Sequence, residues 1–169
     1  YLVGQMAERD RWKRSQVVRW DDARLSGYLA FLTTAKTITA LTCRIVAARG
    51  LKTGFRGIDP VDGLDLLDDA ETERSNRFEA IILLGDMTTI HAAQKLNEAL
   101  WRLEALATDS TLANETQWWA AFEAYREARS VFYAAARPGI GVPSVIVPLS
   151  TWAVPGQPAA RPIEDGTTP

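Results

Sequence analysis

An apolar seam between Glu71 and Ala107 constrains the fold of this chain more than any other feature. Apolar or small residues recur there at alternating steps of four and three: Phe78, Ile82, Gly85, Thr89, Ala92, Leu96, Ala99, Leu103 and Leu106. A repeat of about 3.5 residues keeps one stripe of a helix facing a partner helix. Further apolar residues widen this stripe: Ile81, Leu84, Met87, Ile90 and Trp101. The pattern predicts one long central helix that packs against more than one neighbour.

The composition fits a single globular domain and excludes several classes of function. The chain has 169 residues, of which 47% are hydrophobic and 24% are charged. A net charge of −2 gives no electrostatic basis for binding nucleic acid. The single cysteine, Cys43, excludes an intramolecular disulfide and is expected to be a buried core residue. No run of about 18 apolar residues occurs, so we expect no bilayer-spanning segment.

The first helix is predicted to run from about Gln5 to Arg49, where Gly50 supplies the C-terminal cap. Such a helix is about 65 Å long, more than a compact bundle of this size requires. Apolar residues are dense from Leu25 onward and sparse before it, and Gly27 raises the alternative of a kink. We therefore expect three parts: a projecting arm over residues 1–24, a helical bundle over 25–136 and an extended tail over 137–169.

The expected arm combines basic residues with two tryptophans. The basic residues are Arg9, Arg11, Lys13, Arg14 and Arg19, and they alternate with Trp12 and Trp20. This combination is typical of a cytoplasmic membrane–water boundary. Acidic residues nearby, Glu8, Asp10, Asp21 and Asp22, offset much of the charge, so an ordinary solvated helix start is the alternative.

The remaining helices follow from capping signals. Asp59 and Pro60 are typical of a helix N-terminus and predict a short helix over 60–69. Asn114 and Gln117 form a capping-box pattern for a last helix that ends near Ala136. The predicted fold is therefore all-α: an antiparallel bundle of three long helices plus a short one, with an extended proline-rich C-terminal tail.

The tail is defined by its prolines. Seven of the eight prolines of the chain lie in it: Pro138, Pro143, Pro148, Pro155, Pro158, Pro162 and Pro169. This spacing is incompatible with a helix and favours an extended course. The first half of the tail is apolar, with Val142, Val145, Ile146, Val147, Leu149 and Trp152. Two alternatives remain open: these residues pack on the bundle itself, or they bind another chain.

Catalytic and metal-binding patterns are lacking. The only histidine is His91, and neither a Glu-x-x-His pair nor a G-x-S-x-G nucleophile elbow occurs. Seven acids lie between positions 59 and 73, but their spacing differs from that of a calcium-binding loop, and a solvated face is favoured. Asp86 comes closest to an apolar stretch, and we expect it to face water. We therefore predict no catalytic residue, no cofactor and no metal site, and no enzyme.

An aromatic set offers an alternative to core packing. Its members are Trp101, Trp118, Phe122 and Tyr125, and large flat side chains of this kind line small-molecule pockets as well as cores. Adjacent tryptophans, Trp118 and Trp119, lie about 100° apart on a helix. We therefore expect one of the two to reach a second contact, on the tail or on a partner.

One run of residues resembles a loose group of bacterial proteins. The pattern R-W-D-x-x-R-L-x-x-Y-x-x-F-L is formed by Arg19, Trp20, Asp21, Arg24, Leu25, Tyr28, Phe31 and Leu32. It is similar to a pattern in single-pass, membrane-anchored helical proteins of unknown function. The resemblance implies a helical bundle in the cytoplasm, at the inner face of the cell membrane, and no activity.

These observations favour a non-enzymatic interaction or scaffolding module. A more specific form of this hypothesis is a membrane-tethered subunit of a larger assembly. The expected partner is another protein or a second copy of the chain. Residues 1–24 are expected to face a membrane surface, and no binding of nucleic acid is expected. The candidate contact residues are Trp12, Trp20, Val142, Val145, Ile146, Val147, Leu149 and Trp152. The alternative is a small-ligand sensor with an aromatic pocket between the helices.

Overall fold

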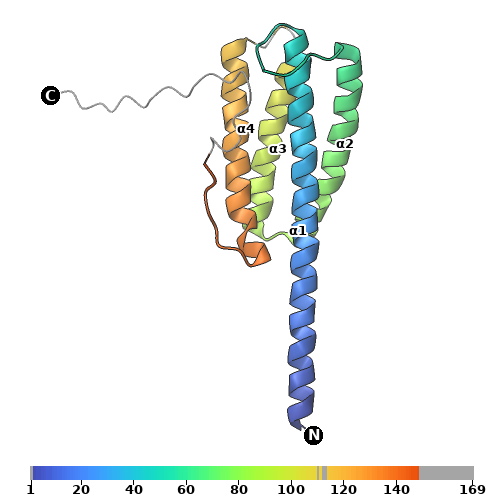
Figure 1. Cartoon of the computed structure of the whole chain (residues 1–169), viewed down its shortest axis with the longest axis vertical. Coiled ribbons are helices and arrows are strands. Elements are labelled where there is room, and N and C mark those ends of the chain that lie inside the picture. The colour runs from blue at the N-terminus through green and yellow to red at the C-terminus, as the bar shows by residue number, and fades with distance from the viewer. Residues whose placement is uncertain (1, 110, 112–113, 149–169) are drawn as a thin grey trace, which may run out of the picture.

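The computed structural model describes residues 2–109, 111 and 114–148, and for residues 2–7, 10, 11, 13 and 14 it describes the backbone alone. The described residues form four α-helices: α1 (Leu2–Ala48), α2 (Pro60–Leu84), α3 (Met87–Thr108) and α4 (Glu115–Ala136). A 3₁₀ turn, η1 (Pro138–Ile140), follows α4. The helices alternate in direction along the bundle, as Figure 1 shows. The prediction of an all-α antiparallel bundle is confirmed.

The division into helices differs from the prediction, because the segment 71–107 is not one helix. Gly85 has an extended backbone (φ −77°, ψ 153°), and its N–H donates to Ile81 O at 2.8 Å and closes α2. The carboxylate of Asp86 then accepts a hydrogen bond from Thr89 N at 2.7 Å and caps the start of α3. One helix therefore ends and the next begins within the four-residue step of the apolar seam from Gly85 to Thr89.

The break changes the course of the seam. Beyond it Ala99 is half-buried, and the other predicted positions are buried in α3: Thr89, Ala92, Leu96, Leu103 and Leu106. Before it Ile82 is 45% exposed, and the buried residue is its neighbour Ile81. The short helix expected over 60–69 also continues without interruption to Leu84. The bundle consequently consists of four long helices rather than three long and one short.

The capping predictions are confirmed. Asp59 caps α2 by accepting a hydrogen bond from Val61 N at 2.9 Å, and Pro60 is the first helical residue. Asn114 accepts from Gln117 N at 2.8 Å, and the Gln117 side chain accepts from Asn114 N in return. These bonds satisfy N–H groups that a helix leaves without partners at its start.

The core is rich in aromatic side chains from α1 and α4. The ring of Phe132 contacts Tyr28 edge to face at 5.9 Å and Phe31 at 5.6 Å between centroids. Trp118 is fully buried, and Trp119 is only 7% exposed. Both tryptophans therefore belong to the interior of the bundle, and neither is available to a partner.

Two glycines bring α1 and α2 close together. The helix α1 passes through Gly27 without interruption, so the kink considered above is not present. A Cβ added at Gly27 would lie 3.3 Å from Ala80 Cβ, and one added at Gly63 would lie 2.8 Å from Ile45 Cγ1. Glycine at these positions allows a close approach between the helices.

Candidate functional site

The N-terminal part of α1 extends beyond the bundle as a single helix (Figure 1). Contact with the bundle begins near Arg24, which donates hydrogen bonds to Leu84 O at 2.8 Å and Gly139 O at 3.1 Å. Before that point four large apolar side chains are more than half exposed: Trp12, Val17, Val18 and Trp20. Within the part of the chain that the structure describes, these side chains stay exposed, and large exposed apolar side chains are candidates for contact with a partner.

The turn between α2 and α3 adds apolar surface at the same end of the bundle (Figure 1). Leu83 is 79% exposed, Met87 is 61% exposed and Ile82 is 45% exposed. We call the two surfaces together the shoulder, which consists of Val17, Val18, Trp20, Leu25, Ile82, Leu83 and Met87. Large apolar side chains left exposed in number at one end of a protein indicate a candidate interaction site.

The described part of the tail returns along α4 as an extended segment (Figure 1). Ser144 Oγ donates to Ala134 O at 2.8 Å, and Ser130 Oγ donates to Val147 O at 2.8 Å. Of the two alternatives for the tail, residues 142–148 therefore follow the first and pack on their own bundle.

The candidate contact residues of the tail are placed only in part. Val145 and Ile146 remain exposed by 50% and 68%, whereas Val142 and Val147 are half-buried. Leu149 and Trp152 lie outside the described residues. The exposed pair leaves apolar surface on the outside of this segment.

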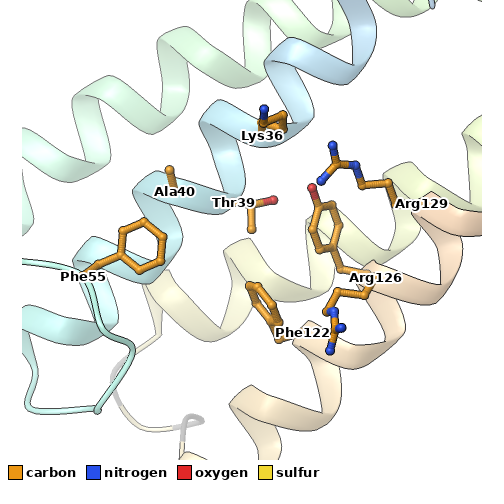
Figure 2. A pocket seen from close by; sticks show the side chains of 8 residues that line it. Lys36, Thr39, Ala40, Phe55, Phe122, Arg126 and Arg129 are labelled. Atoms are coloured by element: carbon orange, nitrogen blue, oxygen red, sulfur yellow. The ribbon is translucent and has the colours of Figure 1, made fainter. Parts of the chain in front are cut away.

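A hollow of about 270 Å³ opens between α1, α4 and the loop that joins α1 to α2 (Figure 2). Its walls are mainly apolar, yet three basic side chains face it. The lining residues are Lys36, Thr39, Ala40, Phe55, Phe122, Tyr125, Arg126 and Arg129. A wider depression of about 410 Å³ lies between the start of α3 and the end of α4, but among its described lining residues only Asp86 is charged.

Two of the three basic side chains of the hollow, Arg126 and Arg129, belong to α4. Arg126 is 5% exposed and pairs with Glu123, with an Nη1–Oε1 distance of 2.7 Å. Arg129 is 8% exposed, donates to Tyr133 Oη at 3.3 Å and stacks over that ring. Burial raises the pKa of Tyr125, and the neighbouring Arg129 and Thr39 oppose part of that rise.

The four residues predicted to line an aromatic pocket do not lie together. Phe122 and Tyr125 line the hollow, whereas Trp118 is fully buried in the core. Trp101 is 49% exposed and faces α2 instead. The prediction missed the basic residues of the hollow, although Arg126 and Arg129 stand at helical spacing from Phe122 and share its face.

Trp101 belongs to a polar cluster between α2 and α3. Its Nε1–H donates to Glu71 Oε1 at 2.9 Å, and the guanidinium of Arg74 lies over its ring at 5.3 Å. Arg74 is 4% exposed and also donates to Glu71 Oε2 at 2.7 Å. The side chain of Glu104 completes the cluster, and its Oε1 atom is buried without a hydrogen-bond partner.

The two carboxyl groups of this cluster differ in pKa. Burial alone would raise the pKa of Glu71, but hydrogen bonds from Arg74 and Trp101 outweigh it and lower the pKa. Burial, followed by the charge of Glu71, raises the pKa of Glu104 to about 7. The two carboxyl groups interact, and burial beside Glu71 favours the protonated form of Glu104 up to about pH 7.

This result corrects the expectation that Asp86 is the acid closest to burial. Asp86 does face water, as predicted, and serves as the cap of α3. The perturbed acid is Glu104, which lies 33 positions along the chain from its partner Glu71. His91 is exposed on α3, and among the described residues no group of three or more His, Cys, Asp or Glu could hold a metal ion.

One helical stretch among the described residues is long and apolar enough, by length and composition alone, to cross a membrane. It lies within Ser15–Ala48 of α1. However, 61% of the qualifying window is buried inside the bundle, and the core helix of a globular protein meets the same test. The result is compatible with association with a membrane and with an ordinary core helix.

Comparison with protein-family models, with curated proteins and with solved structures gave no match.

Proposed function

We propose that this chain is a non-enzymatic interaction module that binds a protein partner, or a second copy of itself, through the shoulder. The observation that carries the proposal is the exposure of large apolar side chains on both parts of the shoulder, from 41% for Leu25 to 79% for Leu83. Burying such side chains in an interface gains about 25 cal/mol for each Å² removed from water. The helical arm supports the proposal, because its backbone is already ordered as a helix in the free chain and less conformational entropy is lost when it docks than for an extended segment.

The experiment compares two charge substitutions at exposed apolar positions of α2. Leu83→Glu places a charge in the shoulder, whereas Val61→Glu does so at the opposite end of the helix, where the side chain is 67% exposed. Sedimentation over a range of concentrations measures self-association, and affinity capture from source cells measures binding of other proteins. We expect Leu83→Glu to weaken association and Val61→Glu to leave it unchanged. If both variants associate as strongly as the unmodified chain, the shoulder is not the binding surface.

A finer proposal places the bundle in the cytoplasm at the inner face of the cell membrane, with the arm as a stalk. Exposed Arg9 and Arg19 beside Trp12 and Trp20 support it, since basic and aromatic side chains favour the membrane interface. Flotation with anionic liposomes tests this location. A chain that does not float at low ionic strength would contradict it.

The second candidate function is a small-ligand sensor. The observation that favours it is the hollow between α1 and α4, which combines aromatic walls with basic side chains. A ligand that binds only the folded chain raises its melting temperature by mass action. Thermal unfolding with a panel of small molecules is the measurement, and a melting temperature that no compound changes would contradict this function.

A further inference from the structure

The hollow has a polar end and an apolar end. Figure 2 shows the side chains of Lys36 and Arg129 toward one end of the hollow, with Lys36 above Thr39 and Arg129 to its right in this view. Ala40 and Phe55 lie toward the other end, and the ring of Phe122 lies below them. An occupant that matched both ends would need a polar head and an apolar body.

The apolar end depends on the loop between α1 and α2, which is fixed to α1. Thr53 Oγ1 donates to Cys43 O at 3.1 Å, and Ile58 N donates to Arg44 O at 3.3 Å. These two bonds bracket Phe55, whose ring packs against the core. The wall is therefore formed before any ligand arrives, as in most small-molecule sites.

The charges at the hollow determine the sign of the polar head. Three cationic side chains line it, and the carboxylate of Glu123, on α4, pairs with Arg126. Within the described residues no carboxylate lies within ion-pair distance of Lys36. Like charges around one hollow repel one another, although solvent screens the exposed Lys36 more than the buried arginines, and an anion between them relieves this repulsion.

The size of the hollow limits the body of the occupant. A volume of about 270 Å³ is just below the range of about 300–1,000 Å³ that is usual for sites of drug-sized ligands. Aromatic rings on the walls favour a flat or flexible apolar body. A carboxylate is the anion that fits such a body, because a guanidinium binds it through two parallel hydrogen bonds.

We propose that the hollow binds a small carboxylic acid with an apolar body, whose carboxylate lies between Lys36 and Arg129 and whose body contacts Phe55 and Phe122. The proposal deepens the second candidate function and rests on it, and it is independent of the shoulder. Lys36 supplies the charge that no residue of the described bundle compensates, and Arg129 supplies directed hydrogen bonds.

The test is a titration of the ¹⁵N-labelled full chain with four probes. Benzoate and octanoate carry both features, acetate carries the charge alone, and benzyl alcohol carries the apolar body alone. We expect benzoate and octanoate to shift the amide signals of Thr39, Ala40 and Phe55, with weaker effects from the other two probes. Higher ionic strength should weaken the binding of the acids.

The matched variants are Lys36→Met and Lys95→Met. Both lysines are exposed on helices, and methionine keeps the apolar stem and the helix propensity, so neither variant threatens folding. Lys36→Met should weaken benzoate binding about tenfold, the loss expected for one charge-assisted hydrogen bond. Lys95→Met, on the exposed face of α3, should bind like the unmodified chain.

The outcomes separate the two levels of the hypothesis. If benzyl alcohol binds as well as benzoate, or if Lys36→Met binds benzoate normally, the anionic head is wrong while the hollow remains a ligand site. If none of the four probes shifts these amides, both the carboxylate assignment and the sensor function fall.

Discussion

Replacing Glu104 with glutamine should remove a pH dependence from the stability of this protein. The carboxyl group of Glu104 lies beside Glu71, and its pKa is raised from 4.5 to about 7. A raised pKa means that the folded chain binds a proton that the unfolded chain has released. The stability from this proton is complete below about pH 4.5 and is lost as the pH rises through about 7.

The size of the effect follows from the shift. Each pKa unit corresponds to about 1.4 kcal/mol, so a rise from 4.5 to about 7 would give at most about 3 kcal/mol. Glu104 is only half-buried, and screening by solvent reduces this to about 1–2 kcal/mol. The pKa of Glu71 is lowered, so its contribution to the stability of the fold is present at neutral pH. That contribution is lost only as the pH falls below about 4.5, outside the pH range in which Glu104 acts.

The assay is urea unfolding of the unmodified chain and of Glu104→Gln at several values between about pH 5 and pH 8. Glutamine resembles the protonated acid, so the two proteins should have similar stability at the acidic end. At the alkaline end the variant should be more stable by about 1–2 kcal/mol. Glu98→Gln is the control, because Glu98 is exposed on the same helix and its ion pair with Lys95 is solvated. A free-energy difference between Glu104→Gln and the unmodified chain that does not change with pH would refute the reasoning.

Two further predictions concern the packing of α1. Gly63→Ala should destabilise the fold by about 1–2 kcal/mol, because the new methyl group meets Ile45 at 2.8 Å and this overpacking exceeds the gain in helix propensity; urea unfolding measures it, and a more stable variant would contradict the close approach. Cys43 is fully buried, and burial raises the pKa of its thiol to about 12. A thiol reagent should therefore label it only as fast as the protein unfolds, and rapid labelling under native conditions would contradict its place in the core.

Local signals predicted much of the fold. The caps at Asp59 and Asn114 were correct because each depends on a few adjacent residues. The break at Gly85 and Asp86 was missed because the apolar repeat continues in step on both sides of it. Glycine followed by an aspartate N-cap is the signal that could have located this break.

The candidate sites were harder to predict, because they join residues that are distant in the chain. Glu71 and Glu104 come together only when α2 packs on α3, so no spacing in the sequence predicts that their carboxyl groups interact. The hollow joins Lys36 of α1, Phe55 of the loop and a face of α4. Only the α4 face is readable from helical periodicity.

The exposed shoulder carries the central claim, and photo-cross-linking in the source cells tests it most directly. Benzoylphenylalanine is placed at Val18 and at Leu83, both in the shoulder, and at Val61 as the control, since all three side chains are more than half exposed. We predict adducts to the same protein from Val18 and Leu83 and none from Val61. Adducts from Val61 alone, or equal labelling from all three positions, would contradict the account.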